Sequence, residues 1–275
     1  MALPLAASKR EALGLRILSA VVLVPLGVLS AWLGGPLLGG LTILAAVFMG
    51  WEWGRLTDRG HFGAGGMLVA TTAVIGASLA AFGWHTAGIG VLVVGAAARM
   101  IWPTREGGAN LWAAIGTLWI GAPCIAVIWL AADPTLGRPT VLWLFALVWA
   151  TDSAAYLVGG WVGGPRLAPR WSPKKTWSGA VGGIAAAALV GAITANILGI
   201  SMLSPVSWIS MGLSATAQLG DLAESAAKRH FGVKDMSGLI PGHGGLLDRL
   251  DGLLAASVLA AILTLASGAS PVMWS

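Results

Sequence analysis

The sequence predicts an all-α integral membrane protein with about nine transmembrane helices and a cytoplasmic N-terminus. Hydrophobic residues make up 57% of the 275 residues and charged residues only 10%, whereas a soluble domain has about 25% charged residues. The apolar residues form long segments, as expected when each span needs about 20 mainly apolar residues. The placement of Lys and Arg gives the orientation.

Nine apolar segments are candidate spans, and the fourth, sixth and eighth are among those that hold or adjoin a charge or a Gly cluster. In order along the chain they are residues 15–34, 36–54, 64–83, 85–102, 111–131, 140–161, 179–199, 203–220 and 250–268. We divide the chain into a five-span N-terminal region, residues 1–138, and a four-span C-terminal region, residues 139–275. The second region holds nearly all of the polar chemistry.

The distribution of basic residues supports both the helix count and the orientation. With nine alternating spans and a cytoplasmic N-terminus, fifteen of the sixteen Lys and Arg residues fall on the cytoplasmic side and only Arg138 on the other. This asymmetry follows the positive-inside rule, and one helix more or fewer before residue 160 would remove it. The loops at 162–178 and 221–249 are therefore expected to face the cytoplasm.

Composition also limits the kinds of partner and site. The net charge of +5 is typical of positive-inside loops beside anionic lipid headgroups, and no basic cluster is long enough to predict nucleic-acid binding. Cys124 is the single cysteine, which excludes a disulfide framework and a cysteine-based metal site. His243 has no second His or Cys nearby, which argues against zinc.

The strongest concentration of polar residues lies between the last two expected spans, at residues 219–252. It holds five of the eleven acidic residues, four of the sixteen Lys and Arg residues and two of the four His. Charges placed beside hydrocarbon cost free energy, so ionisable residues there are candidates for function. If the eighth helix continues to about Arg229, helical spacing puts four residues on one face. These are Asp221, Glu224, Ser225 and Lys228.

A Gly-rich turn, Pro241–Gly245, joins the two helix ends of this stretch. Its sequence P-G-H-G-G does not suit a regular helix, and Gly lets backbone N–H groups approach an anion closely. Asp248 and Asp251, three residues apart, share a face at the start of the ninth span. Such an arrangement suits Mg²⁺, which prefers oxygen ligands and shares its shell with substrate phosphates.

Two further features lie outside this stretch. Asp152 is inside the sixth span, where a charge costs about 2.5–3.5 kcal/mol on insertion scales. It requires a metal, a basic partner or a water-filled cavity, unless it makes a hydrogen bond between helices. The loop 159–179 has four basic residues and three hydroxyls, which suit phosphate, although any positive-inside loop would be basic. Together these residues predict a membrane-embedded, metal-dependent phosphate site, without identifying the reaction.

Three blocks of the C-terminal half resemble the phosphatidate cytidylyltransferases, also called CDP-diacylglycerol synthases. The longest block is Ser225–Asp251, with K-R-x4-K-D and P-G-H-G-G-x-x-D-R-x-D intact, and the preceding Gly220-Asp221-Leu222 also fits. The others are T-D-S-A-A-Y at 151–156 and S-P-K-K-T-W-S-G at 172–179. The N-terminal half resembles the family only in helix pattern. Three residues depart from the family pattern: Ala227, Gly252 and Ser178, the last of which replaces a common acidic residue and is left out of the metal set.

The resemblance implies transfer of a cytidylyl group from CTP to phosphatidate, giving CDP-diacylglycerol and pyrophosphate for phospholipid synthesis. It implies Mg²⁺, as two divalent ions with room for a monovalent cation, and a homodimer in the cell (inner) membrane with the active site facing the cytoplasm. The residues expected to act in catalysis are Asp152, Lys175, Asp221, Lys228 and Asp248, with Asp152, Asp221 and Asp248 as metal ligands. Those expected to bind substrate are Ser172, Lys174, Lys175, Thr176, Ser225, Lys228, Arg229, Lys234, His243 and Arg249.

Three other functions fit some of these observations. A cytidylyltransferase for another lipid phosphate, such as an isoprenoid phosphate or an ether lipid, would carry much the same motif. A CDP-alcohol phosphotransferase would share D-x2-D-G at 248–252, but no Asp or Glu follows Asp251 to complete its motif. A transporter for an anionic solute would fit nine helices with an intramembrane Asp. The polar residues, however, gather at one face instead of lining a path across the bilayer.

Overall fold

The computed structural model describes residues 9–101, 110–201 and 205–273, which form nine α-helices, one β-hairpin and a short 3-10 helix. The helices are α1 (Lys9–Leu33), α2 (Gly35–Thr57), α3 (Ala64–Ala81), α4 (His85–Ile101), α5 (Asn110–Ala131), α6 (Gly137–Val162), α7 (Trp177–Ile197), α8 (Pro205–His230) and α9 (Leu247–Ser267). The antiparallel strands β1 (Arg166–Ala168) and β2 (Ser172–Thr176) lie between α6 and α7, and the 3-10 helix η1 is Pro271–Met273.

The helices confirm the all-α class and follow the nine expected spans in order. Six of them, α2, α3, α5, α6, α7 and α9, are long and apolar enough to cross a membrane, and α1 and α4 contain shorter apolar segments. Helix α8 is in neither group, because Ser and Thr residues in its first half, and Gln and charged residues in its second half, lower its hydropathy. Its extension to His230 is the one required to place residues 221–228 on one helix. The side of the membrane that each end faces stays a prediction.

The basic loop between the sixth and seventh spans contains a hairpin that the sequence did not predict. Helix α6 ends at Gly163, whose φ of 65° is a conformation that favours glycine. Strand β2 then leads directly into α7, where the Thr176 hydroxyl accepts a hydrogen bond from the backbone N–H of Gly179 at 3.1 Å. This N-cap holds the hairpin at the start of α7.

Helices α6 and α7 approach each other closely at the hairpin end. A Cβ atom on Gly179 would lie 2.6 Å from the Ala155 carbonyl oxygen, and one on Gly182 would lie 2.7 Å from the Val158 side chain. Small residues permit this contact between helices in lipid. The block 151–156 on α6 is thereby placed next to the block 172–179.

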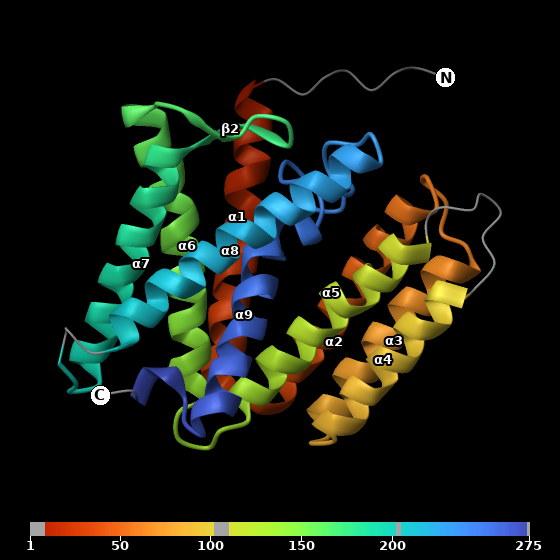
Figure 1. Ribbon diagram of the computed structural model, residues 1–275, viewed down its shortest axis with the longest axis horizontal. Coiled ribbons are helices and arrows are strands. Elements are labelled where there is room, and N and C mark those ends of the chain that lie inside the picture. Colours follow the sequence, from red (N-terminus) through yellow and green to blue (C-terminus); the bar gives the residue numbers. More distant parts are fainter. Residues whose placement is uncertain (1–8, 102–109, 202–204, 274–275) are drawn as a thin grey trace.

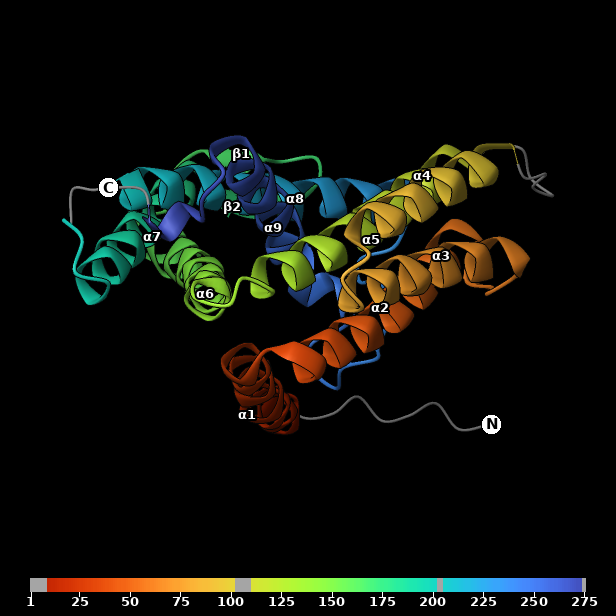
Figure 2. The ribbon, with the colours of Figure 1, turned by 90° about the horizontal axis from the view of Figure 1, so that it is seen from below.

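The helices form two groups that share a central helix (Figure 1). Helices α2 to α5 lie side by side in one group, α6 to α8 form the other, and α9 packs against α5, α6 and α8. Helix α1 lies at the edge, against α2 and α6 (Figure 2).

The buried cluster of the first group includes three residues from the polar stretch: Ala227, Met236 and Leu247. The polar stretch therefore packs against the first group, although it begins on α8 in the second group. The division at residue 138 stays a prediction.

The predicted orientation can be tested by labelling two exposed loop residues. In a Cys124→Ser background, Arg170→Cys and Thr135→Cys should react with an impermeant thiol reagent from opposite sides of the membrane. Both residues are exposed. Cys124 is the single cysteine of the sequence, so its replacement leaves one thiol in each variant. Labelling of both variants from the same side in intact cells would contradict the nine-span orientation.

Candidate active site

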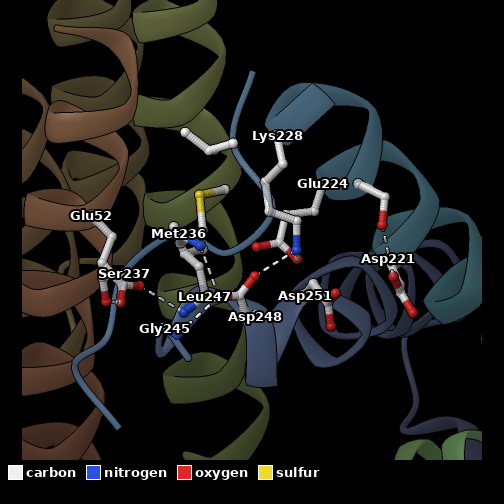
Figure 3. A network of polar contacts seen from close by, with 12 residues as sticks. Glu52, Asp221, Glu224, Lys228, Met236, Ser237, Gly245, Leu247, Asp248 and Asp251 are labelled. Atoms are coloured by element: carbon white, nitrogen blue, oxygen red, sulfur yellow. Dashed lines mark hydrogen bonds and ion pairs between the residues drawn. The ribbon is translucent and has the colours of Figure 1, made fainter. Parts of the chain in front are cut away.

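The carboxylate of Asp248, in the first turn of α9, is held by three donors (Figure 3). Its Oδ2 accepts hydrogen bonds from the backbone N–H groups of Met236, at 2.9 Å, and Gly245, at 2.8 Å. Its Oδ1 lies 2.5 Å from Nζ of Lys228 on α8. The Gly-rich turn, α8 and α9 therefore meet at this one side chain.

Lys228 also contacts Glu224, one turn earlier on α8. Its Nζ lies 3.6 Å from Oε2 of Glu224, as the expected placement of both residues on one helix face permits. Burial, together with the nearby charge of Asp251, raises the pKa of the Glu224 carboxyl well above its usual range, although Lys228 opposes this. Burial alone would lower the pKa of Lys228, but Glu224 and Asp248 hold it above its usual value. Lys228 is therefore a buried residue that stays charged.

A second ion pair joins the hairpin to α8. Nζ of Lys175 on β2 contacts Oδ2 of Asp221, and both side chains are partly exposed. The Ser225 hydroxyl donates to Oδ1 of Asp221 at 3.4 Å. These contacts bring two of the three sequence blocks together.

The third block joins the same cluster through Asp152 on α6. The charges that act on Asp152 include the carboxylates of Asp251 and Asp221 and the basic groups of Lys175 and Arg249. Residues that are far apart in the sequence thus form one charged site at the start of α9.

A largely apolar cavity of about 540 Å³ opens beside this site. Its walls come from α1, α2, α5, α6, α9 and the segment 239–246, and its acidic, basic and histidine lining residues are Asp152, His243 and Arg249. Nδ1 of His243 lies 2.6 Å from the hydroxyl of Ser19 on α1, so the Gly-rich turn also contacts the first helix. The cavity can accept a hydrocarbon chain whose polar end lies against the charged site.

The acidic residues suit a cation by their chemistry. Among the described residues, no group of three or more His, Cys, Asp or Glu side chains is already arranged around one metal position. The carboxylates of Asp152, Asp221 and Asp251 are nevertheless electrostatic neighbours that repel one another, which favours binding of a cation between them. A carboxylate has about four acceptor positions, so the three donors on Asp248 leave room for one further ligand. The expected ligand set stays a prediction.

The other expected substrate-binding residues have different surroundings. Thr176 is buried and caps α7. Arg229 donates to the carbonyl oxygens of Trp171, at 3.3 Å, and Val233, at 2.9 Å, and so ties the hairpin to the end of α8. Four basic side chains are exposed, and Ser172 is partly buried. The exposed ones are Lys174, Arg229, Lys234 and Arg249.

One residue of the site was missed in the sequence. Glu52 on α2 is completely buried and accepts hydrogen bonds from the Ser237 hydroxyl, at 2.5 Å, and from the backbone N–H groups of Leu246 and Leu247, both at 2.8 Å. An acidic residue inside the expected span 36–54 was the available signal, because the same reasoning singled out Asp152.

Comparison with known proteins gives a consistent result along nearly the whole chain. The sequence model described as "Cytidylyltransferase family" matches residues 14–266. A protein of Brucella suis named phosphatidate cytidylyltransferase is 39% identical over 257 residues, which are 89% of this chain and 90% of that protein. Proteins of the same name are 44% identical over 129 residues in Haemophilus influenzae, 45% of each chain, and 42% identical over 135 residues in Staphylococcus aureus, 48% of this chain and 51% of the other.

Removal of the Lys228 charge should destabilise the protein. In Lys228→Met the carboxylates of Glu224 and Asp248 lose their shared cation, and breaking a buried pair in this way costs about 3–5 kcal/mol. Thermal unfolding of the purified protein in detergent should show a clearly lower midpoint. Adding Glu224→Gln should restore part of the loss, because the amide never carries the charge that Lys228 balances when the Glu224 carboxyl is ionised.

Lys234→Met is the matched control, since Lys234 is exposed and its replacement should leave the midpoint nearly unchanged. Equal midpoints for Lys228→Met and Lys234→Met would contradict the role given to the buried ion pairs.

Proposed function

The chain belongs to the cytidylyltransferase family, and we propose that it transfers the cytidylyl group of CTP to phosphatidate, giving CDP-diacylglycerol and pyrophosphate. It is a membrane enzyme of the nucleotidyltransferase class, and the similarity to a phosphatidate cytidylyltransferase extends over 89% of the chain. The structural observation that carries the proposal is the meeting of three motif blocks at one site, through the pairs Lys175–Asp221 and Lys228–Asp248 and the charge of Asp152.

In the reaction, a phosphate oxygen of the lipid forms a bond to the α-phosphorus of CTP. The bond from this phosphorus to the bridging oxygen breaks, and pyrophosphate leaves with that oxygen. Both reactants are anions, so neutralisation and alignment should supply most of the rate enhancement. Lys175 and Lys228 pair with carboxylates of the cluster, and the charge of Arg249 acts on Asp152, so we assign these three residues to the phosphates. We assign no general base, because the lipid phosphate is already largely ionised.

The remaining basic and hydroxyl residues complete the proposed substrate contacts. Exposed Lys174 and Lys234 would attract the triphosphate, and Ser172 and Ser225 would add hydrogen bonds. Thr176 and Arg229 would act mainly by fixing the hairpin, because their polar atoms already contact the chain.

A bound divalent cation, proposed as Mg²⁺, would neutralise phosphate charge and stabilise the leaving pyrophosphate. Asp152 and Asp221 would hold it, with Asp251 beside them and Asp248 contributing its remaining acceptor position. A second divalent ion, or a monovalent one, stays a prediction from the resemblance to the family.

We propose that the apolar cavity binds the acyl chains of the lipid. Its hydrocarbon lining suits fatty acyl groups, and Arg249 and His243 on its wall suit the lipid phosphate. We propose that this end faces the cytoplasm, where CTP is present, because fifteen of the sixteen Lys and Arg residues fall on that side in the nine-span arrangement. A homodimer in the cell (inner) membrane is part of the same proposal.

The proposed activity can be tested with CTP labelled in its α-phosphate. The purified protein should place the label in a lipid only when phosphatidate and Mg²⁺ are present, with one pyrophosphate released per labelled lipid. Asp221→Asn should lower turnover by about 100-fold or more, because it removes charge that acts on the reacting phosphates. Asp133→Asn, in the loop between α5 and α6, should keep near-normal turnover.

An isoprenoid phosphate or an ether-linked phosphatidate supplied in competition identifies the acceptor. If either lipid is labelled faster than phosphatidate, that lipid and not phosphatidate is the substrate. Absence of labelling with every acceptor would reject the proposed reaction.

The lipid cavity can be tested separately by filling it. Ala45→Phe on α2 adds a ring to the cavity wall and should raise the KM for phosphatidate by about tenfold, the scale of an overpacking penalty. The KM for CTP should change little. Val47→Phe is the matched control, because Val47 lies on the same helix, is 42% exposed and does not line the cavity. Equal effects of the two variants would contradict the assignment.

A further inference from the structure

Glu52 is a buried carboxylate far from the other acidic residues of the site in the sequence. It lies on α2 in the N-terminal half and has no exposed surface. The other residues of α2 are mostly apolar. A buried carboxylate is costly unless hydrogen bonds satisfy it, and Glu52 receives three of them, all from the segment 237–247 (Figure 3).

Two of these hydrogen bonds act at the start of α9. The first N–H groups of a helix have no acceptor inside the helix, and a negative charge there is favourable. Oε1 of Glu52 accepts from Leu246 N–H and Oε2 accepts from Leu247 N–H. Oδ2 of Asp248 accepts from the N–H group of Gly245, the residue before Leu246. Three consecutive N–H groups are therefore shared between two carboxylates.

The two carboxylates approach the same residue from different sides. A Cβ atom on Gly245 would lie 2.6 Å from Oε1 of Glu52 and 3.0 Å from Oδ2 of Asp248. The turn is thus enclosed between them, and a shift of the turn would move the backbone donors that orient Asp248. The same shift would move Arg249 and Asp251, which follow in the first turns of α9.

We propose that Glu52 is a positioning residue for the catalytic site. By holding the turn before α9, it fixes Asp248 and the charged residues behind it in the arrangement needed for cytidylyl transfer. The inference rests on the proposed function, and it adds a part to the site from the N-terminal half of the chain. Glu52 itself contacts neither reacting group.

The first test is Glu52→Gln, which keeps the size of the side chain and replaces one acceptor oxygen with a donor. At least one of the three hydrogen bonds is then lost. We expect kcat to fall by about 10- to 100-fold, because small misplacements of reacting groups slow the chemical step by this order, with the KM values for CTP and phosphatidate nearly unchanged. Hydrogen exchange, followed by mass spectrometry on the full chain, should be faster in the segment 236–248 and unchanged in α3 and α7.

Two controls separate positioning from general stability. Asp58→Asn removes another carboxylate at the end of α2, one that lies 3.9 Å from buried Arg99 and does not contact the turn. Its thermal midpoint should fall, yet its kcat should stay near that of the unchanged protein. Ser237→Ala removes one donor to Glu52 and leaves both α9 N–H groups bound, so its kcat should also stay near normal.

Gly245→Ala disturbs the same contact from the opposite side and keeps the test open if Glu52→Gln folds poorly. It should reproduce the fall in kcat and the local exchange. Normal kcat or unchanged exchange in both Glu52→Gln and Gly245→Ala would overturn the proposal. A fall in kcat for Asp58→Asn or Ser237→Ala equal to that for Glu52→Gln would overturn it too. If the unchanged protein transfers no cytidylyl group, the proposed function fails, whereas the exchange result still reports whether Glu52 holds the turn.

Discussion

The site is organised around the N–H groups at the start of α9, which have no acceptor inside the helix. A buried helix end must find acceptors for them, and Asp248 and Glu52 supply these acceptors from two distant parts of the chain. Because Glu52 belongs to α2, satisfying the helix end also fixes the Gly-rich turn against the N-terminal helices. The buried contacts of Met236 and Leu247 with the same group of helices add packing to this link.

Charge balance then determines which other elements meet at α9. The carboxylates of Asp152, Asp221, Glu224, Asp248 and Asp251 gather around it, and Lys175, Lys228 and Arg249 are the nearby basic groups. Away from water, such charges are tolerated only when they are paired. The basic groups on β2, α8 and α9 belong to two of the sequence blocks and Asp152 belongs to the third, so charge balance involves all three blocks. The excess of carboxylates leaves negative charge that a cation would neutralise.

The parts of this arrangement that depend on local spacing could be predicted from the sequence. The nine helices, the continuation of α8 beyond residue 220 and the Glu224–Lys228 pair all follow from apolar length and helical periodicity. The hairpin could not be predicted, because strands of three and five residues have no clear alternating pattern. The role of Glu52 was hidden for another reason. Its partners are mainly backbone groups nearly 200 residues away, and backbone donors leave no mark in a sequence. The cavity likewise depends on side chains from five helices.

The site also has to serve two reactants that prefer different surroundings. The apolar cavity and the charged cluster share Asp152 and Arg249, so an acyl chain and a nucleotide can approach the same point without either leaving its preferred medium. Lys175 and Lys228 are already held by carboxylates there. Lys228 is the more buried of the two, and its ion pair with Asp248 offsets the free-energy cost of removing water from its ammonium group during folding. An arriving phosphate would exchange partners with a carboxylate instead of removing water from a free ammonium group. Such exchange needs the carboxylates to stay in place, which gives the rigid start of α9 its importance for the chemistry.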